Sequence, residues 1–207
     1  MYKAVIFDVD GTIVDTRFVV DAVEEAFYQL RGRRLTTQDT DFIYGATHQA
    51  TLDFLQITLD ELPCFTKIFQ HYMNQFLPRQ RLFPGIWETL NSIKEQGYVL
   101  GINTSRTREE VRFVVETVGL DFPSLCSHAI TCDMVSAPKP DPESLLLFSR
   151  LSGIAMQDIL FVGDSVFDQG CAQNAGCAFA LATWGTKQQI PAQYYPAAPT
   201  DVLTILK

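Results

Sequence analysis

The second half of the chain repeats one pattern four times, and this repetition constrains the fold more than any other feature. Each repeat runs from a helical segment through a glycine into a short apolar run and then into a polar loop. Short apolar runs that alternate with helices are typical of a parallel sheet buried on both faces. The sequence therefore predicts an α/β fold, a Rossmann-like parallel sheet core with helices on both faces. The glycines that end the helical segments are Gly97, Gly119, Gly153 and Gly176.

The chain opens with a further apolar run, Ala4–Phe7, which stops at two aspartates, Asp8 and Asp10. The run is rich in β-branched and aromatic residues and predicts a buried strand, and Gly11 predicts the turn that follows it. Two carboxylates about 4 Å apart repel each other by ~4 kcal/mol at an effective dielectric constant near 20. The pair therefore indicates a cation, a shared proton or an anionic ligand close by, unless one aspartate only caps a helix and the other is solvated.

Between this strand and the repeats lies a long block of helical patterns without a strand signal. Asp15 or Thr16 is expected to cap its first helix. A block of about seventy residues is too long for an ordinary crossover between strands. We therefore expect an α/β core formed by residues 1–14 and 84–207, and a small all-helical cap, residues 15–83, inserted after the first strand.

The composition argues against several classes of partner. Hydrophobic residues make up 47% of the 207 residues, which is enough for a sizeable core, and the formal net charge is −8. An acidic chain is poorly suited to nucleic acid or to an anionic membrane surface, and no apolar run reaches membrane-spanning length. The five cysteines show no zinc-site or disulfide spacing, and the first strand begins too early for a signal peptide. We expect a cytoplasmic protein with no nucleic acid and no membrane partner.

Polar side chains follow the apolar runs, and parallel strands gather the loops after them at one edge of the sheet. Asp8 follows one run and Thr104 ends a second. Asp164 follows a third, and Lys139 lies in the loop after a fourth. Each has an ordinary explanation alone: an aspartate or a hydroxyl at a helix start, or a solvated lysine. Together they offer what phosphoryl transfer through an aspartate needs, namely a nucleophilic carboxylate, acids for a divalent cation and for proton transfer, and an ammonium and a hydroxyl for the phosphoryl oxygens.

Four motifs in this set resemble those of the haloacid dehalogenase superfamily of phosphohydrolases, in the family's order and spacing. They are Asp8-Val9-Asp10-Gly11-Thr12, Thr104 after a strand, Lys139-Pro140-Asp141-Pro142 and Gly163-Asp164-Ser165-Val166-Phe167-Asp168. The inserted helical block resembles the cap of the phosphoglycolate phosphatase-like and β-phosphoglucomutase-like branch, and Phe83-Pro84-Gly85 resembles the return hinge of that branch. The four motifs together are specific and span nearly the whole chain.

This resemblance implies roles for the acids. Asp8 would be the nucleophile, and Asp10 the general acid and base. Mg²⁺ would be held by Asp8, the backbone carbonyl of Asp10 and Asp164. Asp168 would orient Lys139 or a metal-bound water. The expected catalytic residues are Asp8, Asp10, Thr104 and Lys139, and the expected metal site comprises Asp8, Asp10, Asp164 and Asp168.

The resemblance, together with the positions of residues in the loops, predicts a substrate site. Thr104 and Lys139 would bind the phosphoryl group. Arg106 could hold a second anionic group of the substrate or be a solvated residue at a helix start. His48 could contact the substrate or lie on the surface. The expected substrate-binding residues are Thr104, Ser105, Arg106, Lys139, Gly45 and His48.

The activity that the resemblance implies is a Mg²⁺-dependent phosphatase that hydrolyses a small phosphomonoester, of the phosphoglycolate type, through an aspartyl-phosphate. Its partner would be a small phosphorylated metabolite, and the protein would be a monomer or homodimer. Asp10 favours phosphate chemistry over dehalogenation, and Gly163-Asp164 favours a hydrolase over a mutase. Three alternatives stay open: a phosphosugar mutase, an inorganic pyrophosphatase on the same scaffold, and a non-catalytic phosphate-sensing or partner-binding protein.

Overall fold

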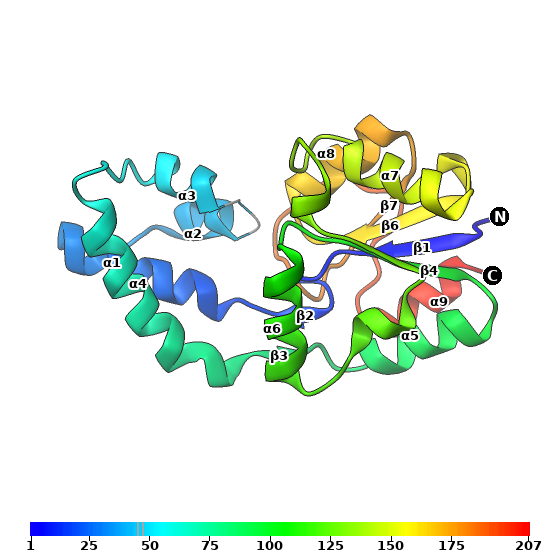
Figure 1. Ribbon diagram of the computed structural model, residues 1–207, viewed down its shortest axis with the longest axis horizontal. Helices are drawn as coiled ribbons and strands as arrows, with labels where there is room; N and C mark the ends of the chain where they lie inside the picture. The colour runs from blue at the N-terminus through cyan, green and yellow to red at the C-terminus, as the bar shows by residue number, and fades with distance from the viewer. Residues whose placement is uncertain (45, 47) are drawn as a thin grey trace. The chain divides into compact units, whose positions relative to one another are not determined.

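The computed structural model describes residues 1–44, 46 and 48–207, and it divides into two compact units (Figure 1). One unit comprises Met1–Val14 and Leu82–Lys207, and the other comprises Asp15–Arg81. Two short strands pair with each other where the chain leaves the first unit and where it returns. These strands are β2 (Val14–Asp15) and β3 (Arg81–Leu82). The sequence did not reveal them, because two residues are too few to show a strand pattern.

Five parallel strands form one sheet in the order β5-β4-β1-β6-β7, with β1 in the centre. Every residue of β1 is buried, and its last residue, Phe7, lies opposite Ile102 of β4 and Val162 of β6. The strands are β1 (Ala4–Phe7), β4 (Val99–Asn103), β5 (His128–Ile130), β6 (Ile159–Gly163) and β7 (Ala178–Leu181). The predicted α/β fold with a parallel sheet core is confirmed.

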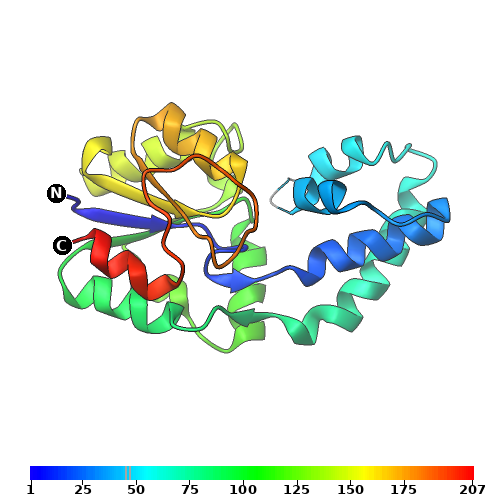
Figure 2. The ribbon, with the colours of Figure 1, turned by 180° about the vertical axis from the view of Figure 1, so that it is seen from behind.

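Helices cover both faces of this sheet (Figure 1). Successive side chains of β1 point to opposite faces. Val5 and Phe7 belong to the core cluster of α5, α6 and α9, and Ala4 and Ile6 to the cluster of α7 and α8. Figure 2 shows α9, near the C-terminus, beside α5. The helices are α5 (Ile86–Glu95), α6 (Arg108–Val118), α7 (Glu143–Ser152), α8 (Val166–Ala175) and α9 (Val202–Ile205).

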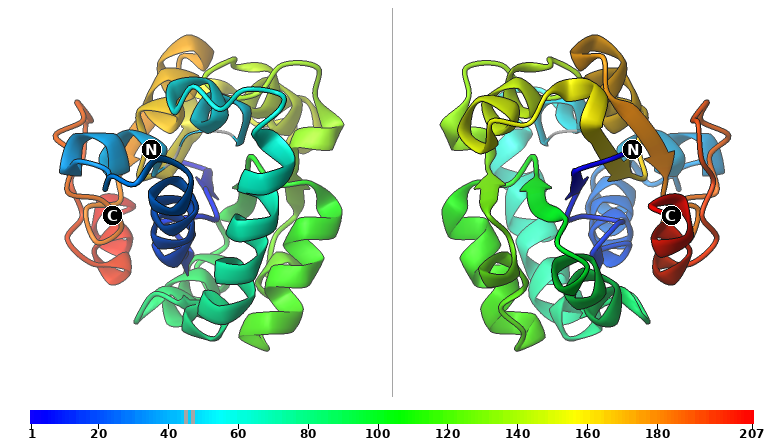
Figure 3. Two further views of the ribbon diagram at one scale, coloured as in Figure 1. Left: turned by 90° about the vertical axis from the view of Figure 1, so that its left-hand side faces the viewer. Right: turned by 90° about the vertical axis from the view of Figure 1, so that its right-hand side faces the viewer.

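The second unit consists of helices around an apolar core of its own. Within it, α1 and α4 lie side by side (Figure 3). Pro63 occupies the first turn of α4, where a missing backbone N–H leaves no helix hydrogen bond unmade. Its helices are α1 (Phe18–Arg31), α2 (Thr37–Ile43), α3 (His48–Phe54) and α4 (Leu62–Phe76). The predicted helical insertion after the first strand is thus part of the fold. No helix among the described residues has both the length and the apolar character that crossing a membrane requires.

The expectation that Asp15 or Thr16 caps α1 is wrong. Arg17 holds the N-cap position, and no side chain there bonds to the helix. The Asp15 carboxylate instead accepts hydrogen bonds from Nε and Nη2 of Arg17 at 2.9 and 2.6 Å. These bonds lower the pKa of Asp15. Two parallel charge-assisted hydrogen bonds to a guanidinium outweigh one bond to a helix N–H.

Gly101 in β4 lets α7 come close to the sheet. The ring of Phe148, a fully buried residue of α7, lies where a Cβ atom on Gly101 would be. Any side chain at position 101 would displace this ring. Protein interiors are packed as densely as organic crystals, so they accommodate such a displacement poorly.

We therefore expect Gly101→Ala to lower the free energy of unfolding by about 1–3 kcal/mol, the usual range for overpacking a core. Chemical denaturation measures this change. In a Gly101→Ala/Phe148→Leu double variant the smaller side chain makes room, so the two losses should combine to less than their sum. Strictly additive losses would show that the ring is not the obstacle.

Candidate active site

Lys139 draws together residues from distant parts of the chain. Its ammonium nitrogen donates hydrogen bonds to Asp8 Oδ1 at 2.8 Å, to Asp168 Oδ1 at 2.6 Å and to the backbone carbonyl of Asn103 at 3.3 Å. Asp8 follows β1, Asn103 ends β4 and Asp168 lies in the first turn of α8. Lys139 is only 7% exposed, so the alternative of a solvated loop lysine is wrong.

Asp164 forms a cluster of three buried carboxylates with Asp8 and Asp168. One carboxylate oxygen from each lies within 4.8 Å of the others. Asp164 directly follows β6 and accepts a hydrogen bond from the hydroxyl of Thr12 at 3.3 Å. The structure thus brings these acids together at the carboxyl edge of the sheet, where ligands of open α/β sheets bind.

This cluster carries more negative than positive charge. Three carboxylates and one ammonium give a formal charge of −3 + 1 = −2 when all four groups are ionised. Burial, together with the neighbouring carboxylates, raises the pKa of Asp8 to about 7 and the pKa of Asp164 well above its ordinary value. Burial alone would lower the pKa of Lys139, but Asp168 and Asp8 reverse this effect and raise it. The ammonium therefore stays charged, and it forms ion pairs with Asp8 and Asp168.

The same residues fit a divalent cation. All the side-chain donors are carboxylate oxygens, which hard cations such as Mg²⁺ and Ca²⁺ prefer. A charge of +2 would balance the cluster and favour the ionised carboxylates. Of the four aspartates expected at the metal site, Asp8, Asp164 and Asp168 form the cluster, whereas the side chain of Asp10 contacts Arg106.

Arg106 and Asp10 form a bidentate ion pair. Nε of Arg106 donates to Asp10 Oδ2 at 2.8 Å, and Nη2 donates to Oδ1 at 2.7 Å. The backbone of Arg106 is held on both sides, because its N–H donates to Thr104 Oγ1 at 3.2 Å and its carbonyl accepts from Cys132 N–H at 2.9 Å. The alternative of a merely solvated arginine at a helix start is wrong. No sequence pattern pairs these two residues, which are 96 positions apart.

Asp168 has a second set of contacts that fixes its carboxylate. Its Oδ2 accepts hydrogen bonds from the backbone N–H and the hydroxyl of Ser165, at 3.1 and 2.5 Å. Ser165 and Asp168 form a capping box at the start of α8, which their spacing could have revealed. Gly163 is required here, because a Cβ atom at that position would lie 2.6 Å from Asp168 Cβ. Asp168 therefore caps α8 and holds Lys139 at the same time.

The other expected substrate-binding residues differ in their burial and in the unit to which they belong. Thr104 is buried beside Arg106, and Ser105 is exposed. His48 is an exposed residue at the start of α3, in the helical unit. Gly45 lies outside the described residues, so its expected role stays a prediction.

Asn103 was missed by sequence reasoning, and no sequence signal marks it. Its carbonyl contacts Lys139, and its side-chain Nδ2 donates to the thiol of Cys171 at 3.8 Å. Its Oδ1 is buried and has no hydrogen-bond partner in the described part of the chain. Asn103 therefore contacts Lys139 through its backbone, while its buried side chain contacts Cys171.

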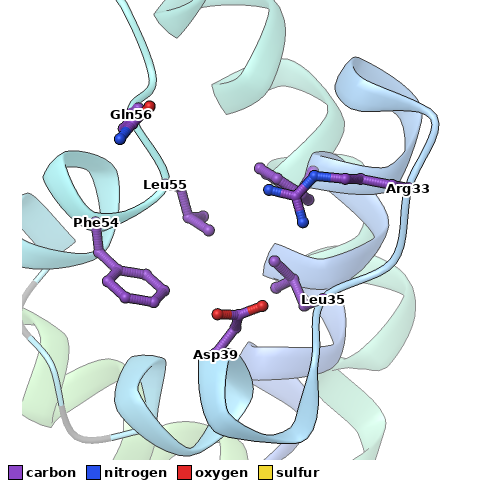
Figure 4. A pocket seen from close by; sticks show the side chains of 7 residues that line it. Arg33, Leu35, Asp39, Phe54, Leu55 and Gln56 are labelled. Atoms are coloured by element: carbon purple, nitrogen blue, oxygen red, sulfur yellow. The ribbon is translucent and has the colours of Figure 1, made fainter.

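A separate pocket lies within the helical unit (Figure 4). Phe54 and Leu55 lie on one side of it, Arg33 and Leu35 lie on the other, and Asp39 lies at the bottom of the view. None of the residues expected at the active site lines it. The lining residues are Phe27, Arg33, Leu35, Asp39, Phe54, Leu55 and Gln56.

The chain is similar to known proteins in both sequence and structure. The sequence model of the haloacid dehalogenase-like hydrolase family matches residues 5–182. A phosphoglycolate phosphatase of Shigella dysenteriae is 30% identical over 211 residues, covering 88% of this chain and 82% of the relative. A pyrophosphatase of Bacillus velezensis is 27% identical over 186 residues, covering 89% of this chain and 84% of the relative. A crystal structure from Lactobacillus plantarum superposes with a TM-score of 0.84 at 26% identity and covers 99% of both chains.

The excess negative charge of the carboxylate cluster predicts how Mg²⁺ changes the thermal stability of the protein. In metal-free buffer near pH 8, Asp164→Asn should leave the melting temperature unchanged or raise it, because folding raises the pKa of Asp164 and so opposes its ionised form. MgCl₂ at about a hundred times its Kd should stabilise the parent protein by about 2.7 kcal/mol, and this gain should be lost in Asp164→Asn. Thermal melting with and without MgCl₂ measures both effects.

The matched control is Glu95→Gln, which removes one negative charge from the exposed end of α5. This variant should keep the stabilisation by MgCl₂. Equal stabilisation of the parent protein and Asp164→Asn would show that the cluster does not bind the ion.

Proposed function

The chain belongs to the haloacid dehalogenase-like hydrolase family, and from this premise we propose that it is a Mg²⁺-dependent phosphatase acting on a small phosphomonoester through an aspartyl-phosphate. The observation that carries the proposal is the Lys139 ammonium 2.8 Å from the buried Asp8 carboxylate, with Asp164 in the same cluster. A carboxylate beside a fixed cation is suited to receive a phosphoryl group, because the same cation stabilises the phosphoryl oxygens.

Asp8 and Asp10 carry the chemical steps in this proposal. First, with Asp10 in its protonated form, a carboxylate oxygen of Asp8 forms a bond to phosphorus while the bond from phosphorus to the leaving oxygen breaks, and Asp10 gives its proton to that oxygen. Next, a water oxygen attacks the phosphorus of the aspartyl-phosphate, Asp10 takes a proton from this water, and the bond between Asp8 and phosphorus breaks. Phosphate leaves, and both carboxyl groups return to their starting states.

The residues around the two acids support these steps. Lys139 and Thr104 bind the phosphoryl oxygens, and Asp168 keeps the Lys139 ammonium in place from 2.6 Å. Asp8, the backbone carbonyl of Asp10 and Asp164 would hold Mg²⁺, which when bound neutralises charge on the phosphoryl oxygens. The positive charge of Lys139 thereby lies directly beside the nucleophile, where it can act on the oxygens of the transferring group.

A small phosphate ester of the phosphoglycolate type is the substrate we propose. A relative named phosphoglycolate phosphatase supports this class, and a relative named pyrophosphatase supports the alternative substrate pyrophosphate. The test is phosphate release from phosphoglycolate, pyrophosphate and β-glucose 1-phosphate, with kcat/KM measured with and without MgCl₂. Hydrolysis of phosphoglycolate is the expected result. Negligible phosphate release with a requirement for a sugar bisphosphate would indicate a mutase, and binding without release would indicate a phosphate sensor.

We expect Asp8→Asn to fold normally and to lose turnover, because an amide does not attack phosphorus as a carboxylate does. The measurement is phosphate release together with circular dichroism. The matched control is Asp158→Asn, which changes an aspartate immediately before the amino end of β6 and should keep its activity. Undiminished turnover in well-folded Asp8→Asn would rule out the proposed nucleophile.

Asp10→Ala should separate the two steps. With p-nitrophenyl phosphate the leaving group needs little proton donation, so Asp8 should still be phosphorylated once. Loss of the base should then slow hydrolysis by about 10²- to 10⁴-fold. Stopped-flow absorbance should show a burst of about one p-nitrophenolate per enzyme, as expected for an accumulating covalent intermediate. Slow release of p-nitrophenolate from the first turnover onward would contradict this role.

A further inference from the structure

Arg106 has a second edge of its guanidinium that its ion pair with Asp10 does not use. Nε and Nη2 donate to the two carboxylate oxygens of Asp10. Nη1 has no hydrogen-bond partner in the part of the chain that the structure describes. A guanidinium carries five N–H donors in a planar fork, and it can bind two planar acids on two edges. The Nη1–Nη2 edge is therefore a fixed donor pair beside Asp10.

The position of this edge is set by the fold. The backbone of Arg106 is bonded at its N–H to Thr104 and at its carbonyl to Cys132. Its side chain is 21% exposed, and the Asp10 side chain is 34% exposed. The pair therefore lies between the buried cluster and solvent, where a ligand can reach it. A group held by Arg106 would be adjacent to the proposed general acid.

An anionic ligand needs such a cation here. The chain carries a formal net charge of −8, and the neighbouring cluster adds three carboxylates against one ammonium. Like charges at close range disfavour an acidic leaving group. Arg106 stays charged, because Asp10 more than offsets the effect of burial and raises its pKa. Lys139 is bonded to Asp8 and Asp168 and serves the transferring phosphoryl group, so Arg106 is a cation left for a second anion of the substrate.

We propose that the free edge of Arg106 binds a carboxylate or phosphate of the leaving group, and that Arg106 selects substrates whose anion lies one or two bonds from the departing oxygen. This inference rests on the proposed phosphatase function. One guanidinium that holds both Asp10 and the leaving group's anion brings the departing oxygen next to Asp10. An anion further along the leaving group would draw that oxygen away, and a neutral leaving group would have no partner. The class comprises phosphate esters of α-hydroxy acids and phosphoanhydrides with a terminal phosphate.

Three substrates test this selection: phosphoglycolate, its one-carbon-longer homologue 3-phosphooxypropanoate, and neutral-ended 2-hydroxyethyl phosphate. The parent protein should have the highest kcat/KM on phosphoglycolate. Arg106→Gln should lower the preference for phosphoglycolate over 2-hydroxyethyl phosphate about thirtyfold, the effect of losing charge-assisted hydrogen bonds. If the loss of Arg106 also changes the pKa or the position of Asp10, turnover of both substrates changes alike, and the effect cancels in the ratio of their kcat/KM values. Arg106→Lys keeps the charge without the fork and should lose part of the preference.

The control variant is Arg108→Gln, which removes an exposed positive charge two residues away and should leave the ratio unchanged. An unchanged ratio in Arg106→Gln, or an equal fall in Arg108→Gln, would overturn the inference. Should Arg106→Gln not fold, an undiminished preference in Arg106→Lys would overturn it. Equal hydrolysis of all three substrates by the parent protein would overturn the inference and leave the phosphatase function standing. Hydrolysis of none of them would overturn both.

Discussion

The hydrogen bonds of the Lys139 ammonium to Asp8 and Asp168 are the interaction on which the site depends. They join the ends of β1 and β6–α8 to the loop that carries the lysine, and a third bond reaches the end of β4 at Asn103. Removing one partner of a buried ion pair typically costs about 3–5 kcal/mol of folding stability, because the other charge is left uncompensated. Loss of the Lys139 ammonium should therefore lower the free energy of unfolding by that amount. The residual negative charge of the cluster is what suits it to a divalent cation.

The parallel sheet explains how residues so distant along the chain come to share one site. Each strand delivers the residue after it to the same edge, and right-handed crossovers bring the next strand back in the same direction. Burial of β1 on both faces fixes the position of Asp8 within a rigid part of the core. Small residues complete the arrangement where backbone or side chains must come close, as Gly163 does beneath Asp168. The chemistry therefore depends on loops, while their placement depends on the strands.

Much of this could be predicted from the sequence, because the strand ends and the four motifs are local patterns. The parallel sheet, and the gathering of Asp8 and Asp164 at its carboxyl edge, follow from the positions of these residues directly after apolar runs. The pairing of Arg106 with Asp10 could not be predicted, because it depends on the distance between two loops 96 residues apart. Asp15 was expected to cap α1, but a neighbouring guanidinium competed for its carboxylate. Local rules fail at such places because a tertiary or charged partner outweighs the backbone contact.

The most direct test of the central claim is to locate the phosphoryl group during turnover. The parent protein would be mixed with phosphoglycolate and MgCl₂, quenched within milliseconds and reduced with borohydride, which converts an aspartyl-phosphate to homoserine. Tandem mass spectrometry would then map the modified residue. The account predicts homoserine at position 8 and at no other aspartate. Phosphate release without modification at position 8, in a sample quenched during the first turnover, would contradict it.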